Sequence, residues 1–145
     1  MILKTHTSIE QSKQLLKLGI EPNTADAVYV AFRTKDGNIT YDYAIKDGTL
    51  DEEDVPAWTL SILIEMLPKH IELHNTEYKY RYDYIHKLSI SYDCYKKKWI
   101  CGYKANDWAA HIEENELLFD GIFNLVCYIL NGIYKLEKIN SDEES

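Results

Sequence analysis

The amino-acid sequence predicts a single α+β domain over residues 1–140, with helices packed on one face of an antiparallel sheet. Alternating side chains predict the sheet, first as an N-terminal hairpin over Val28–Ile45 and later as a C-terminal meander over Tyr78–Tyr103. The most apolar run in the chain, Glu116–Asn131, predicts a long buried C-terminal helix for this sheet to pack against. Strands joined by short turns leave little room for the crossover helices of a parallel sheet.

The first predicted element is a helix over roughly Ser8–Leu18. Two pairs of residues fit the reciprocal capping box at its start: Thr7 with Glu10, and Ser8 with Gln11. Gly19 is expected to end this helix, because glycine readily adopts the left-handed conformation of a helix C-terminus. Pro22 then prevents the helix from restarting.

A hairpin is predicted next, because two alternating segments flank Asp36–Gly37, a strong signal for a two-residue turn. The predicted register pairs Phe32 with Tyr41, Val30 with Tyr43 and Val28 with Ile45. Every one of these pairs is apolar or aromatic, so the register is self-consistent.

A second helix is expected over Asp54–Leu67. Asp54 is the predicted N-cap, and Pro56 is tolerated in the first turn, where an amide would have no partner in the helix. Pro68 ends the helix.

Two stretches of the N-terminal half carry a family resemblance. TSIEQSKQLLKLGIEPNTAD (Thr7–Asp26) and DVPAWTLSILIEMLP (Asp54–Pro68) resemble segments of small uncharacterised proteins of gut anaerobic bacteria and their prophages. The resemblance covers two helices with their caps and includes no chemical motif. It implies a mobile-element or accessory context and no particular activity.

The C-terminal strands follow Pro68. We expect a short strand over Ile71–His74, a strand with four tyrosines over Tyr78–Tyr84, and two further strands over Leu88–Cys94 and Trp99–Tyr103. A turn centred on Lys97–Lys98 would pair Cys94 with Cys101 and Tyr92 with Tyr103. Lys104–Asn115 is predicted to be a loop.

The buried helix is expected to end at Asn131–Gly132, with an apolar stripe facing the sheet: Leu118, Ile122, Leu125 and Ile129. It is too short and too often interrupted by polar residues to be a membrane span. The acidic tail, Ser141–Ser145, is expected to be disordered.

The formal net charge of -8 is unevenly distributed. Asp51–Asp54 contributes -4 and the tail Glu137–Ser145 contributes -3, so the remainder is close to neutral. This acidity disfavours generic nucleic-acid binding. Met1–Ser8 has no signal-peptide pattern, and three cysteines without such a signal favour a reducing, cytoplasmic location.

Candidate chemistry is sparse. Cys94 and Cys101, if paired across strands, could form a redox switch or half of a metal site, but three structural cysteines are the plainer interpretation. His70 and His74 lack the further ligands that a metal site needs. His111 could form an acid–base pair with Asp107 or Glu113, although such a cluster is more often a solvated loop. The sequence thus predicts no catalytic residue, metal or cofactor.

The tyrosine row is the most distinctive local feature. A binding surface here would use Tyr80, Tyr82 and Tyr84 with Lys79 and Arg81, because tyrosine is common at interface hot spots and the basic residues add positive charge. The plainer alternative is that the tyrosines form the inward face of the sheet beneath the C-terminal helix.

The leading prediction is a small non-enzymatic cytoplasmic accessory protein that binds a protein partner, from a mobile element or prophage. One alternative is a hydrolase-like enzyme that uses His111 and a neighbouring acid. Another is a nucleic-acid contact module that uses Tyr78–Tyr84 and the nearby basic residues. The sequence leaves the partner's identity and the oligomeric state open.

Overall fold

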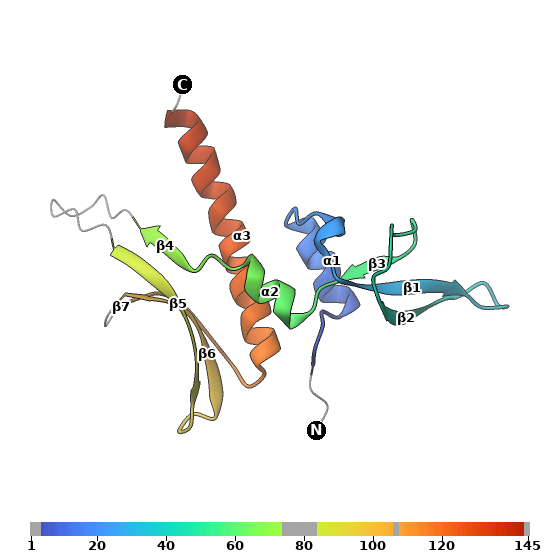
Figure 1. The fold of residues 1–145 in the computed structure, drawn as a ribbon, viewed down its shortest axis with the longest axis horizontal. Coiled ribbons are helices and arrows are strands. Elements are labelled where there is room, and N and C mark those ends of the chain that lie inside the picture. The colour runs from blue at the N-terminus through green and yellow to red at the C-terminus, as the bar shows by residue number, and fades with distance from the viewer. Residues whose placement is uncertain (1–3, 74–83, 106–107, 144–145) are drawn as a thin grey trace. The chain divides into compact units, whose positions relative to one another are not determined.

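The computed structural model describes residues 4–73, 84–105 and 108–143. The chain divides into two compact units: unit 1 comprises Met1–Ile64 with Tyr134–Ser145, and unit 2 comprises Glu65–Ile133. Each unit contains an antiparallel sheet, and the combination of these sheets with helices confirms the predicted α+β class (Figure 1). The single domain over residues 1–140 stays a prediction.

The described elements follow the predicted order of helix, hairpin, helix, meander and long helix. In unit 1 they are α1 (Ile9–Lys17), the 3-10 helix η1 (Pro22–Thr24), β1 (Ala27–Arg33), β2 (Ile39–Ile45) and β3 (Val55–Ala57). Helix α2 (Leu60–Met66) crosses the unit boundary and leads to β4 (His70–Leu73), β5 (Tyr84–Asp93), β6 (Lys98–Ala105), β7 (Trp108–Asn115) and α3 (Leu118–Glu143). The strand orders are β2-β1-β3 in unit 1 and β4-β5-β6-β7 in unit 2.

Helix α1 confirms the most local of the predictions. The Ser8 hydroxyl accepts a hydrogen bond from the Gln11 amide, and the Gln11 side chain accepts one from the Ser8 amide, each at 3.1 Å. At the other end Gly19 has φ of 96°, and the Ile20 amide donates to the Leu15 carbonyl at 3.2 Å. Both helix ends are therefore fixed by residues that are neighbours in sequence.

The predicted register of the first hairpin is wrong by one residue. Tyr41 lies opposite Ala31 rather than Phe32, and the other predicted pairs shift in the same way. The cause is the turn: the Gly37 amide donates to the Thr34 carbonyl at 3.0 Å, and the Thr34 amide donates to the Asn38 carbonyl at 2.8 Å. The loop therefore has three residues with Gly37 at positive φ, where the prediction placed a two-residue turn.

The second helix begins later than predicted, because Val55–Ala57 forms strand β3 and pairs with β1. Helix α2 starts at Leu60, and the Leu63 amide donates to the Thr59 carbonyl at 3.0 Å. Asp54 is consequently not a helix N-cap. The pairing of β3 with a strand distant in sequence outweighs the local helix signal.

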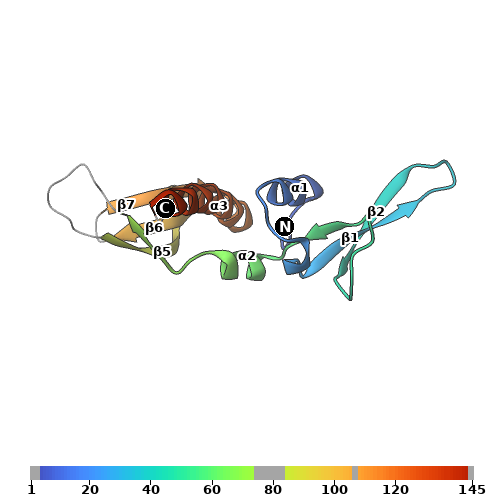
Figure 2. The same cartoon turned by 90° about the horizontal axis from the view of Figure 1, so that it is seen from above.

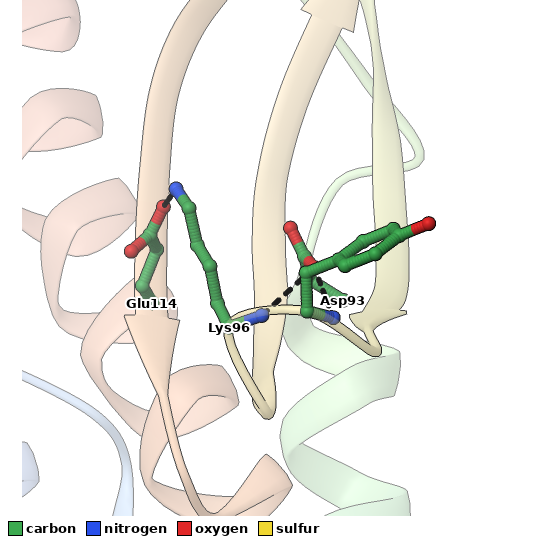
Figure 3. Close-up of polar contacts among 4 residues, drawn as sticks. Asp93, Lys96 and Glu114 are labelled. Carbon is green, nitrogen blue, oxygen red and sulfur yellow. Dashed lines mark hydrogen bonds and ion pairs between the residues drawn. The ribbon is translucent and has the colours of Figure 1, made fainter.

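The turn between β5 and β6 also differs from the prediction. Asp93 pairs with Lys98, and the Asp93 carboxylate accepts hydrogen bonds from the Tyr95 amide at 2.9 Å and the Lys96 amide at 3.1 Å (Figure 3). The turn is therefore centred earlier in the chain than Lys97–Lys98 and places Ile90 opposite Cys101 and Tyr92 opposite Trp99, so the predicted pairings of Cys94 with Cys101 and of Tyr92 with Tyr103 are wrong. Cys94 instead lies exposed in the turn.

The C-terminal part of the chain differs from the prediction in two elements. Trp108–Asn115 is strand β7 rather than part of a loop, and α3 continues beyond Gly132 to Glu143. The predicted disorder of the tail Ser141–Ser145 stays a prediction. Helix α3 includes residues 141–143, and the last two residues lie outside the described part of the chain.

Helix α3 lies close to the sheet of unit 2. Three of the four predicted stripe residues are almost fully buried: Ile122, Leu125 and Ile129. A Cβ atom added at Gly121 would lie 3.2 Å from the Cys101 sulfur, so the glycine allows a close approach of α3 to β6. The packing of the C-terminal helix on strands is thus confirmed for this unit.

Candidate functional site

The two edges of the unit 1 sheet differ. On one side β3 is buried over all three of its residues and pairs with the first part of β1. Beyond β3, the acidic loop covers the same side of β1, since an Asp54 carboxylate oxygen accepts a hydrogen bond from the Ala31 amide at 3.0 Å. Glu53 adds an ion pair with Arg33. The predicted cap residue Asp54 therefore protects a sheet edge.

Strand β2 forms the opposite edge (Figure 1). Two hydrogen bonds at the ends of β2 show which of its residues face β1. The Lys46 amide donates to the Asp26 carbonyl at 3.1 Å, and the Asn38 carbonyl accepts a hydrogen bond from the Thr34 amide. The main-chain groups of the even-numbered residues therefore point toward β1. Main-chain groups alternate in direction along an antiparallel strand. Those of four β2 residues consequently point outward: Ile39, Tyr41, Tyr43 and Ile45. No strand of the described chain pairs with this outer edge.

The same region exposes large apolar side chains. Ile45 is 82% exposed, Tyr43 is 41% exposed and Ile39 is 40% exposed, all on one face of the sheet, while Phe32 on the other face is 49% exposed. In Figure 2 the β1–β2 ribbon continues well beyond β3. Exposed apolar edge strands favour pairing with another chain, and natural proteins usually protect them. We define Ile39–Ile45 and its outward main-chain groups as the β2 edge.

An aromatic group anchors the β2 edge to the N-terminal segment. The His6 ring stacks on Tyr43 with 3.7 Å between ring centroids, and Tyr29 meets Tyr43 edge-on at 5.8 Å. The Tyr29 hydroxyl donates a hydrogen bond to the Thr7 carbonyl. Burial raises the pKa of Tyr29 and of Tyr43, so both phenols stay neutral at physiological pH. The rings thus hold one part of β2 in place.

This stack predicts a pH dependence. Burial, assisted by the positive charge of Lys4, lowers the pKa of His6 from its ordinary value of 6.5, so the fold favours the neutral imidazole. The stabilisation is therefore complete above pH 6.5 and is lost as the pH falls through 6.5 towards the folded-state pKa. Thermal unfolding between pH 8 and pH 5 should show a larger fall in Tm for the wild type than for His6→Phe. Equal falls in the two proteins would contradict this role of His6.

Unit 2 contains the histidine that sequence reasoning selected. His111 lies in β7, where its Nε2 is 2.7 Å from a Glu113 carboxylate oxygen, and its ring stacks on Tyr128 of α3 with 3.6 Å between centroids. The structure therefore brings together His111 and Glu113. Asp107, the other predicted partner, lies outside the described residues.

Two thiols lie near this pair without the properties of a nucleophile. Burial raises the pKa of Cys101 and of Cys127 to about 11, and the charge of Glu113 acts in the same direction. Both thiols are therefore protonated at neutral pH, whereas a catalytic cysteine needs a lowered pKa. All three cysteines are free.

The predicted tyrosine surface lies almost entirely outside the described residues. This applies to Lys79, Tyr80, Arg81 and Tyr82. Tyr84 begins β5 and lies opposite Leu73 of β4. Sequence reasoning missed the β2 edge because alternation identifies a strand without showing its position in the sheet. The sequence signal that could have indicated the β2 edge is the row of apolar and aromatic residues on the predicted return strand: Ile39, Tyr41, Tyr43 and Ile45.

Three further findings concern function. No helix in the described ranges is long and apolar enough to cross a membrane. Within the same ranges, no group of three or more His, Cys, Asp or Glu side chains could hold a metal ion. The chain matches no protein-family model, no curated protein and no solved structure.

Proposed function

We propose that this chain is a small, non-enzymatic accessory protein of the cytoplasm that binds a protein partner at the β2 edge. The observation that supports this most directly is the row of outward main-chain groups beside exposed apolar side chains on β2. A partner segment in extended conformation would add to the sheet as a further strand. Main-chain hydrogen bonds would supply affinity, and the side chains of alternate residues would supply specificity.

The context of a mobile element or prophage is part of this proposal and rests on the resemblance of Thr7–Asp26 and Asp54–Pro68. An accessory protein of that kind needs a surface for a partner and no catalytic centre. The β2 edge belongs to the sheet that lies between these two segments in the chain.

The enzyme alternative has one geometric element in its favour, the 2.7 Å contact of His111 with Glu113. The two thiols influenced by Glu113 have raised pKa values, which disfavours a cysteine nucleophile beside this pair. Tyr128 also covers the histidine ring by stacking on it. We therefore favour a structural role for this pair.

The proposal is tested by removing outward amides while keeping the sheet. In the double variant Ile39→Pro/Ile45→Pro, both prolines lie where the amide faces outward, a position at which an edge strand tolerates proline. The matched control Ile39→Ala/Ile45→Ala loses the same side chains and keeps both amides. Partners captured from native host lysate would be compared by mass spectrometry for the wild type and both variants.

We expect the wild type to capture a stoichiometric partner that the proline variant loses and the alanine variant retains in part. Amide hydrogen exchange of β1 and β3 would show whether the proline variant keeps its sheet. Equal capture by the wild type and a folded proline variant would contradict binding at the β2 edge.

A further inference from the structure

We propose that the occupant of the β2 edge is an extended segment of a basic partner protein, with a lysine or arginine opposite Asp42 and apolar residues at alternate positions. This inference rests on the proposed function and specifies the chemistry of the partner. It follows from the register of β2, from the charge around it and from the position of Asp42.

The register fixes the pattern of the partner segment. Residues directly opposite each other on neighbouring strands point to the same face of the sheet. Ile39, Tyr43 and Ile45 expose apolar surface on one face, so the residues opposite them and opposite Tyr41 should be apolar. The three intervening partner residues would lie opposite Thr40, Asp42 and Ala44 on the other face. Asp42 is the central residue of the seven-residue strand, so either strand direction gives the same pattern.

The charge around the β2 edge favours a basic segment. The stretch Ala27–Ala57 contains seven acidic and three basic residues, and four of the acidic ones, Asp51–Asp54, belong to the loop beside the opposite edge. Arg33 is ion-paired with Glu53, and the Lys46 ammonium donates a hydrogen bond to the Asn23 carbonyl at 3.0 Å. Asp42 itself is exposed at the edge. The Asp42 carboxylate attracts a positively charged residue opposite it and repels an acidic one, and the acidic loop of the same unit adds a weaker, longer-range attraction for a basic partner.

The same charge disfavours a second copy of the chain as the occupant. A two-fold antiparallel pairing of two β2 strands in full register would place Asp42 opposite Asp42. Like charges directly opposite each other destabilise a pair of strands. A partner with lysine or arginine at this position replaces that repulsion with an opposite-charge pair.

The test uses the full isotope-labelled chain and two soluble peptides with the alternating pattern of the proposed segment. The peptides differ only at the central residue, which is lysine in one and glutamate in the other. Titrations followed by two-dimensional NMR at low salt would locate the bound peptide and measure its Kd. We expect shifts along Ile39–Ile45 and about tenfold tighter binding of the lysine peptide, since opposite-charge and like-charge pairs differ by roughly this factor.

The variant Asp42→Lys should reverse the preference between the two peptides. Asp36→Lys, in the hairpin turn, is the matched control, because it makes the same charge change away from the strand and should preserve the preference. Binding at β2 with equal affinity for both peptides would contradict the inference of a basic partner. It would still support the proposed function, in which a partner strand adds at the β2 edge. Absence of shifts in β2 with either peptide would overturn strand addition as well. Concentration-dependent shifts of β2 without peptide would show a second copy as the occupant and overturn the inference.

Discussion

Replacing Trp58 by alanine is expected to lower the free energy of unfolding by about 4 kcal/mol. Trp58 is fully buried and is the largest fully buried side chain of the described residues. Its indole Nε1 donates a hydrogen bond to the Thr24 hydroxyl at 3.0 Å, and its own amide donates to the Thr7 hydroxyl at 3.1 Å. Truncation would leave a large cavity and remove the bond to Thr24. Urea unfolding followed by far-UV circular dichroism would measure the loss.

The variant Trp58→Phe separates ring volume from hydrogen bonding. Phenylalanine retains an aromatic ring and lacks the Nε1 donor, so we expect a loss of about 1–2 kcal/mol. In β1 and β3, amide hydrogen exchange should increase more in Trp58→Ala than in Trp58→Phe. If the alanine variant lost less than the phenylalanine variant, Trp58 would not have the packing role assigned to it.

The second large effect is expected for Gly102→Ala in unit 2. A Cβ atom at Gly102 would lie 2.2 Å from the His111 carbonyl oxygen and 3.0 Å from the Ile112 Cα atom. These are main-chain atoms of β7, which cannot move away as a flexible side chain could. We expect a loss of about 3 kcal/mol or more, because β6 and β7 must separate locally to accept the methyl group. Equilibrium urea unfolding would measure it.

Gly132→Ala is the matched control for this prediction. Gly132 lies within α3, and nothing lies within 4 Å of an added Cβ atom. Alanine in a helix interior is expected to raise stability by roughly 0.5–1 kcal/mol. The two glycine substitutions should therefore change stability in opposite directions. An unchanged unfolding midpoint for Gly102→Ala would contradict the close approach of β6 and β7.

The fold could be predicted where neighbouring residues determine it. The start of α1 depends on Ser8 and Gln11, three residues apart, and its end depends on Gly19. The hairpin was also identifiable, but Asp36–Gly37 fits both a two-residue turn and a three-residue loop with glycine at its last position. One residue in the loop decides the register of the whole pair of strands.

Other elements depend on contacts that a linear pattern does not contain. Strand β3 exists because Val55–Ala57 pairs with β1, which lies about 30 residues earlier in the chain. The turn after β5 depends on a side chain, since Asp93 bonds to two amides and Lys97 adopts a φ of 55°. Such a conformation is uncommon for lysine, so no sequence pattern predicts it.

The candidate site was only partly accessible to sequence reasoning. The proximity of His111 and Glu113 follows from their spacing of two residues on one strand, even though the sequence predicts a loop for this segment. The β2 edge requires the strand order, which is a property of the folded sheet. The same residues would be less exposed, and their main-chain groups would be paired, if another strand lay beside β2.

The protected edge of the unit 1 sheet has a consequence for stoichiometry. Because Asp54 bonds to Ala31 and β3 is buried, a strand can add to this sheet from one direction only. A sheet with two open edges could bridge two partner molecules and support a growing polymer. Under the proposed function, the acidic loop would leave the unit 1 sheet with one open edge, so strand addition to this sheet would give one partner molecule for each copy of the protein.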